Sequence, residues 1–256
     1  MHPGWGGKTE IFMPESLAFT RLLNHLFGGV IDSIFNIVGF HPTDPAAPIT
    51  DAFALELLVV AGLIAFFIIV RLTLSVENPN PFQQVAEMIH EAIGGQAEQV
   101  IGHGYQRFQA YLTCIFLFVL LNNLVGLIPG IKAPTSSIIT TLGLAVPTFI
   151  FYNFYGLKEQ GLIGYLKHFA GPIWWMAWLV FPIEIFSHLA RILSLSVRLY
   201  ANMFAGDLVT SVFFSLFPIG VPAIFLGFHV AISIIQAFVF MLLTMIYLSL
   251  ATSHDH

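Results

Sequence analysis

The chain has 256 residues, of which 57% are apolar and only 9% are charged. A soluble domain of this size carries roughly a quarter charged residues, so the composition excludes an ordinary soluble protein and predicts a membrane protein. The net charge of −5 gives no indication of a nucleic-acid partner, and the single cysteine, Cys114, excludes an internal disulfide.

The N-terminal segment, residues 1–50, combines an amphipathic stretch with a linker. Between residues 22 and 40, apolar side chains fall on one helical face, whereas Asn24 and Asp32 fall on the other. This pattern predicts a helix at a membrane surface or on a partner. The sequence HPTDPAAP, residues 41–48, predicts a linker because its prolines cannot continue a helix. We expect the whole segment to be extracytoplasmic.

The remainder, residues 51–256, predicts a single membrane domain in an all-α polytopic membrane protein. About 20 apolar residues at 1.5 Å each cross a bilayer. Residues 81–106 place an apolar stripe opposite acidic side chains, which predicts a surface helix weakened by Gly94 and Gly95. Five apolar stretches are long enough to cross: residues 53–74, 111–129, 138–156, 173–214 and 222–251.

Cationic residues suggest the orientation of these crossings. We assign Arg71, Arg107, Lys158 and Lys167 to one side, which the bias of cytoplasmic loops toward Lys and Arg makes the cytoplasmic side. The N-terminus and the loop around Lys132 then lie outside.

The last two apolar stretches are too long for an upright crossing. Their lengths as helices are on the order of 60 and 45 Å, against a hydrocarbon core of about 30 Å. Pro182 permits a kink, and FPIGVP at 217–222 supplies a turn. We therefore predict a long hairpin that lies obliquely and is held by a large partner. No internal repeat is visible, so the inverted-repeat signature of many transporters is missing.

A polar cluster interrupts this hairpin around Arg198. Glu184 lies 14 residues before it, roughly 21 Å along a helix axis, and Asp207 lies nine residues after it, roughly 13 Å. On the returning helix, His229 and Gln236 share a face and should reach the depths of Asp207 and Arg198. Because a charge at mid-membrane costs at least about 2.5 kcal/mol, the cluster indicates function. The spacing argues against either carboxylate pairing with Arg198, which implies an acidic partner on another chain.

These residues carry a resemblance to a known family. SLSVRLYANMFAGD (194–207) and FHVAISIIQAFVFMLLTMIYLSLA (228–251) resemble the signature of subunit a of F-type ATP synthases, the stator channel subunit of the membrane sector. NNLVGLIP (122–129) and Glu184 agree with it, and the resemblance covers most of the chain from about residue 20.

The resemblance implies roles for individual residues. Arg198 would be the essential rotor-facing arginine, opposite the ion-carrying carboxylate of the c-ring. Glu184 and Ser187 would belong to the inner half-channel. The outer half-channel and the rotor interface would include Asn202, Asp207, His229 and Gln236.

The resemblance also implies partners and location. The chain would be a non-catalytic, proton-translocating subunit without metal or other cofactor, working with the c-ring and the peripheral-stalk b subunits in the lipid bilayer. We expect a bacterial plasma (inner) membrane rather than the membrane of an energy-coupling organelle.

Two features depart from the family pattern. The family usually has an aspartate where this chain has Gly126, and often has Asp and Asn within the segment that here reads PTSSIITT. Water, or the hydroxyls of Ser136, Ser137 and Thr141, would then replace these outer polar groups.

Two alternatives come from other functional classes. A stand-alone cation channel or transporter could use Arg198 as a gating or anion-binding charge, but it would need an acidic partner within this chain. A membrane enzyme with a histidine-bound metal would need clustered histidines; His188, four residues after Glu184, is better explained as a packed or pore-side residue.

Overall fold

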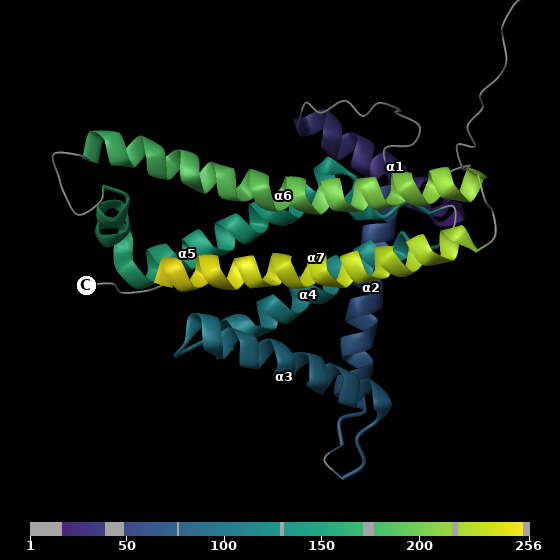
Figure 1. Cartoon of the computed structure of the whole chain (residues 1–256), viewed down its shortest axis with the longest axis horizontal. Coiled ribbons are helices and arrows are strands. Elements are labelled where there is room, and N and C mark those ends of the chain that lie inside the picture. The colour runs from purple at the N-terminus through teal and green to yellow at the C-terminus, as the bar shows by residue number, and fades with distance from the viewer. Residues whose placement is uncertain are drawn as a thin grey trace, which may run out of the picture. The chain divides into compact units, whose positions relative to one another are not determined.

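The computed structural model describes residues 17–38, 49–75, 77–128, 131–170, 177–216 and 220–252. Within these residues all regular structure is helical and no strand occurs (Figure 1). In the part of the chain that the structure describes, five helices are long and apolar enough to cross a membrane, which confirms the predicted all-α polytopic class. The elements are α1 (Ala18–Val38), α2 (Asp51–Leu72), α3 (Pro81–Ile101), α4 (Gln106–Val125), the 3-10 helix η1 (Pro134–Ser136), α5 (Ile138–Ala170), α6 (Ala177–Leu216) and α7 (Val221–Thr252).

The chain divides into two compact units, residues 1–54 and 55–256. In the first unit, the Asn24 side chain on α1 accepts a hydrogen bond from the Ile49 backbone N–H (3.0 Å) and donates to the Ile49 carbonyl (3.1 Å). Asn24, predicted on the polar face, therefore ties α1 to the start of α2. Residues 39 and 40 of the predicted helix and the linker at 41–48 lie outside the described residues.

The second unit begins with the membrane helix α2 and the amphipathic helix α3. Pro81 starts α3, where the missing N–H of proline is tolerated. The helix is continuous through Gly94 and Gly95, and the weakening expected there stays a prediction. It also ends at Ile101, short of the predicted 106, because a turn occupies residues 102–105 before α4 begins.

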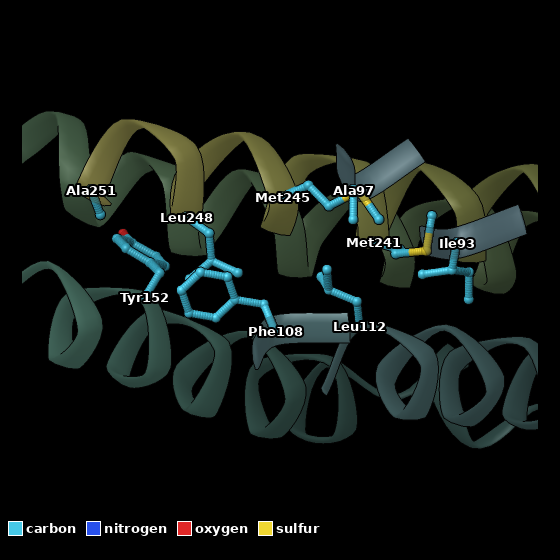
Figure 2. Packing of buried hydrophobic residues seen from close by; sticks show 9 residues of the cluster. All are labelled: Ile93, Ala97, Phe108, Leu112, Tyr152, Met241, Met245, Leu248 and Ala251. Carbon is cyan, nitrogen blue, oxygen red and sulfur yellow. The ribbon is translucent and has the colours of Figure 1, made fainter. Parts of the chain in front are cut away.

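Four helices of the second unit meet in a tightly packed apolar cluster (Figure 2). Lipid tails are as apolar as leucine, so such contacts are held by close packing more than by exclusion of water. Met241, Met245 and Leu248 present one face of α7 to α3 and α4. The whole cluster comprises Ile93, Ala97, Phe108, Leu112, Tyr152, Met241, Met245, Leu248 and Ala251.

A second apolar cluster brings α6 into the same unit. It joins α4, α5, α6 and α7, and small residues such as Ala145 and Ala237 allow the helices to approach closely. Together the two clusters pack α7 against α3, α4, α5 and α6. The second cluster comprises Ile115, Val119, Ala145, Leu195, Leu199, Met203, Ala237 and Phe240.

Helix α5 is longer than predicted. It was expected to end at 156 but runs to Gly161, where a φ of 72° kinks the backbone, and then continues to Ala170. Pro147 lies inside it without ending it. At this end of α5, Glu159 forms an ion pair with Arg107 at the start of α4. Arg107 therefore lies beside the Lys158 segment, as the assignment of both to one side requires.

The last two helices form the predicted long hairpin. Helix α6 has 40 residues and α7 has 32, which correspond to about 60 and 48 Å. Pro182 lies within α6, which continues through it as one helix. The two helices pack side by side and run across the direction of α2 residues 55–72 (Figure 1).

Candidate functional site

Asp207 and His229 face each other across the hairpin. His229 is buried, and its Nε2 lies 3.9 Å from Asp207 Oδ1. The predicted equal depth of these two residues is therefore confirmed. Gly206 makes the approach feasible, because a Cβ at this position would lie only 2.8 Å from His229 Nδ1.

A line of polar groups continues from this pair along α7. Ser233 and Gln236 follow His229 on the same face of the helix, and both are buried. The Asn202 side chain on α6 donates to Gln236 Oε1 at 2.9 Å, so the predicted depth of Gln236, close to Arg198, is also confirmed. The name hairpin track is used below for this set: Asp207, His229, Ser233, Gln236 and Asn202.

Several atoms of the hairpin track have no hydrogen-bond partner in the structure. They are buried, and an unpaired buried polar group costs about 1–3 kcal/mol. Water molecules commonly satisfy such groups in polar interiors. The track therefore has the character of a hydrated path. The unpartnered atoms are Asp207 Oδ2, His229 Nε2, Ser233 Oγ and Gln236 Nε2.

The turn η1 and the end of α4 flank the track. Thr135 donates to Asn123 Oδ1 at 2.6 Å, and Asn123 Nδ2 donates to the Ser233 carbonyl at 3.4 Å. The Ser136 hydroxyl and the Ala133 N–H approach the Asp207 carboxylate. Hydroxyl and amide groups thus surround Asp207 and Ser233 on the side where a carboxylate was expected.

Gly126 stands where the family usually has an aspartate, and Ala133 occupies the space that a side chain at this position would need. A Cβ there would lie 2.6 Å from Ala133 Cβ and 3.0 Å from Ala133 Cα, so this chain uses glycine for close packing of the loop before η1. Among the hydroxyls expected to substitute, Ser136 lies near Asp207. Thr141 instead shares a hydrogen bond of 2.9 Å with the buried Ser196.

Arg198 lies on α6 with its side chain exposed. Its Nη2 is 3.5 Å from the Ser194 hydroxyl, one turn earlier on the same helix. Within the described residues no carboxylate forms an ion pair with Arg198; Asp207 contacts His229, and Glu184 contacts other residues. The prediction that neither carboxylate pairs with Arg198 is confirmed.

A second polar group, here named the Glu184 cluster, lies toward the start of α6. Glu184 Oε1 is 3.4 Å from His188 Nε2 and 4.0 Å from Arg191 Nη2. His188 Nδ1 in turn lies 3.3 Å from the Tyr152 hydroxyl, so it is a packed histidine. Ser187 is half-buried on the same stretch of helix. In the part of the chain that the structure describes, no three His, Cys, Asp or Glu side chains gather as a metal site requires.

Sequence reasoning missed three members of the site. Ser233 carried a usable signal, because it lies four residues after His229 and three before Gln236 and so shares their helical face. Asn123 lies in the NNLVGLIP motif and Thr135 in PTSSIITT, but the sequence does not show that they meet, because their contact depends on how η1 folds back on α4.

Known proteins match most of this chain. Residues 53–249 match the family model described as ATP synthase A chain. The chain is 46% identical over 244 residues to ATP synthase subunit a of Koribacter versatilis, covering 95% of this chain and 100% of that protein. This chain belongs to the ATP synthase subunit a family. Subunit a of Solibacter usitatus is 42% identical over 92% of this chain and 100% of its own length, and that of Bdellovibrio bacteriovorus is 46% identical over 67% and 75%.

Family membership gives the site its context. The chain is a multi-pass membrane protein of the ATP synthase membrane sector, with partners in that sector and a part in ion transport and ATP synthesis.

Proposed function

We propose that this chain forms two half-channels that carry protons to and from the carboxylates of a c-ring and thereby couple translocation to ring rotation and ATP synthesis. The main support for this proposal is Arg198. It is a permanent cation on a long apolar helix, and no carboxylate of the described residues pairs with it. Because a charge within the membrane is costly, its counter-charge has to come from another chain.

A ring carboxylate is a suitable counter-charge. It must be neutral where the ring faces lipid, because an ionised carboxylate is costly to bury there. Opposite Arg198 the ionised form is favoured by the nearby positive charge. A ring site would thus release its proton on one side of Arg198 and take up another on the other side.

The two polar groups supply the two sides. The hairpin track, with Asn202, Asp207, His229 and Gln236, forms the outer half-channel, and the Glu184 cluster with Ser187 forms the inner one. Arg198 lies between them along α6 and blocks direct exchange, and arginine suits this role because it does not deprotonate. Each charge that crosses about 100 mV releases about 2.3 kcal/mol to drive rotation.

The partners follow from the hairpin. Two helices of about 60 and 48 Å are much longer than a hydrocarbon core of about 30 Å, and they run across the direction of α2 residues 55–72 (Figure 1), so they need a large curved surface beside them. The c-ring is that surface, with the peripheral-stalk b subunits and the bilayer on other faces. The bacterial relatives support a bacterial plasma (inner) membrane as the location.

The test is replacement of Arg198 in the assembled enzyme. In Arg198→Ala, ATP-driven acidification of inverted membrane vesicles should be abolished, because ring carboxylates lose the charge that makes them release protons. The measurement is dye quenching per amount of complex that co-purifies with ring and stalk.

Arg107→Gln provides the matched control, because this arginine already has Glu159 as its partner and lies away from the hairpin track. It should assemble and pump close to the native rate. Normal pumping by an assembled Arg198→Ala enzyme would contradict the proposal, as would isolation of the chain alone as a functional cation channel.

A further inference from the structure

The hydroxyl of Ser233 lacks the partner that serine and threonine ordinarily find in a helix. Such hydroxyls commonly bond to the carbonyl one turn earlier. On the same helix, Thr244 donates to the Phe240 carbonyl at 2.9 Å and Thr252 to the Leu248 carbonyl at 2.8 Å. Ser233 is fully buried, yet its Oγ has no partner in the structure. Its hydroxyl is therefore available to a group that the chain itself does not supply.

The spacing along α7 suggests what that group is. His229 lies about 6 Å before Ser233 along the axis and Gln236 about 4.5 Å after it. One water with two hydrogen bonds of about 2.8 Å bridges about 5.5 Å. Without Ser233 the step from His229 to Gln236 would be about 10.5 Å, too long for one water. With Ser233 in between, the intervals of about 6 Å and about 4.5 Å are each close to the distance that one water bridges.

The polar atoms before and after Ser233 on the track also lack hydrogen-bond partners. His229 Nε2, Gln236 Nε2 and Asp207 Oδ2 are buried without hydrogen-bond partners and lie on the same track as Ser233 Oγ. A buried water needs two to four polar partners, and these atoms provide them. The Ser233 turn is held in place, since its carbonyl accepts from Asn123, which is itself fixed by Thr135.

We propose that Ser233 is a further residue of the outer proton path, which relays protons between His229 and Gln236 through one water on each side. This rests on the proposed function above and names the proton, rather than a metal cation, as the ion on this path. A hydroxyl donates one hydrogen and accepts two. It can therefore form an O–H bond to an incoming proton while its own O–H breaks toward the next water, so that it ends unchanged.

Two variants of nearly the same shape separate the effect of the hydroxyl from the effect of side-chain size. Ser233→Thr keeps the hydroxyl and adds a methyl group, whereas Ser233→Val has the same outline without the hydroxyl. Thr244→Val is the control, because that buried hydroxyl is already satisfied within its own helix. The assay is passive proton conductance of vesicles stripped of the catalytic head, in sodium-free buffer, beside ATP-driven acidification before stripping.

We expect the valine variant at 233 to conduct at least about fivefold less than the native chain, the factor that one hydrogen bond is worth. The threonine variant should stay within about twofold of native, and Thr244→Val should not differ from native. If the larger side chains prevent assembly, Ser233→Ala replaces them, with an expected loss of about fivefold.

Other outcomes overturn the relay. Equal conductance of the threonine and valine variants would mean that the hydroxyl is not used, and conductance that requires sodium would exclude a proton path. If Ser233→Val pumps normally while Arg198→Ala does not, the relay is wrong and the proposed function stands. If Arg198→Ala itself pumps, both are wrong.

Discussion

The hairpin track, between α6 and α7, and the Glu184 cluster, on α6, are both polar groups within an apolar protein, but they differ in burial and in pairing. Of the track residues, His229, Ser233 and Gln236 are 3%, 0% and 4% exposed, the Asp207 side chain is 16% exposed, and Asn202 is exposed. Four atoms of the track have no hydrogen-bond partner. In the Glu184 cluster, the Glu184 and Arg191 side chains are 28% and 27% exposed and lie within ion-pair distance of each other.

This difference determines how strongly a substitution in each group should affect proton transport. Around the buried side chains of the track, water enters only where protein groups hold it, so the loss of one group interrupts the path. In a partly exposed cluster, surrounding water can replace a lost partner at little cost, as with ion pairs near a surface. Substitutions of similar chemistry should therefore have larger effects on the track than on the cluster.

The largest contrast is expected between Asp207→Asn and Glu184→Gln. Asp207→Asn keeps the shape but leaves His229 facing an amide that cannot take up a proton, so ATP-driven acidification should fall at least about tenfold, equivalent to about 1.4 kcal/mol. Glu184→Gln should lower it by less than about threefold, because water reaches that side chain. Rates are compared per amount of assembled complex.

Both variants need the same assembly check, by the yield of complex that carries ring and stalk. Equal losses in the two variants, or a larger loss in Glu184→Gln, would show that burial does not distinguish the two polar groups.

A smaller effect is expected where the track is disturbed indirectly. In Gly206→Ala the new Cβ would lie 2.8 Å from His229 Nδ1, so the imidazole must move relative to Asp207. Pumping should fall about threefold to tenfold, the cost of one weakened buried polar contact.

Gly227→Ala provides the control on the same hairpin, because no atom lies within 4 Å of a Cβ built there. It should pump normally and gain roughly 0.5–1 kcal/mol of helix stability, since alanine is a better helix former than glycine. A Gly206→Ala enzyme that pumps like Gly227→Ala would mean that the His229 position is not constrained.

The depth of the hairpin residues could be predicted because both helices are regular. A constant rise of 1.5 Å and 100° per residue made the pairings of Asp207 with His229 and of Gln236 with the level of Arg198 calculable from spacing alone. The same counting places Ser233 on the helical face of His229 and Gln236.

Features that depend on irregular backbone were not predictable in this way. The Asn123–Thr135 contact needs the path of the loop before η1, and the packing of Gly126 on Ala133 is a tertiary contact without a sequence pattern. The early end of α3 and the continuation of α5 to Gly161 depend on which glycines take a positive φ. Several glycines occur in each region, so the sequence left the choice among them open.

The smallest effect is expected at Tyr152, on the edge of the Glu184 cluster. Its ring is buried in the apolar cluster of Figure 2, and its hydroxyl lies 3.3 Å from His188 Nδ1. Tyr152→Phe keeps the ring, and with it the stacking on His188, but removes the hydroxyl. Because Glu184 still contacts His188 on its other nitrogen, pumping should fall less than about threefold. Tyr152→Ala, by contrast, should destabilise the complex by about 3–5 kcal/mol through lost packing, measured by thermal denaturation in detergent. If Tyr152→Phe stopped pumping in a stable complex, the Glu184 cluster would be as sensitive to single groups as the hairpin track, and water would not be able to replace its partners.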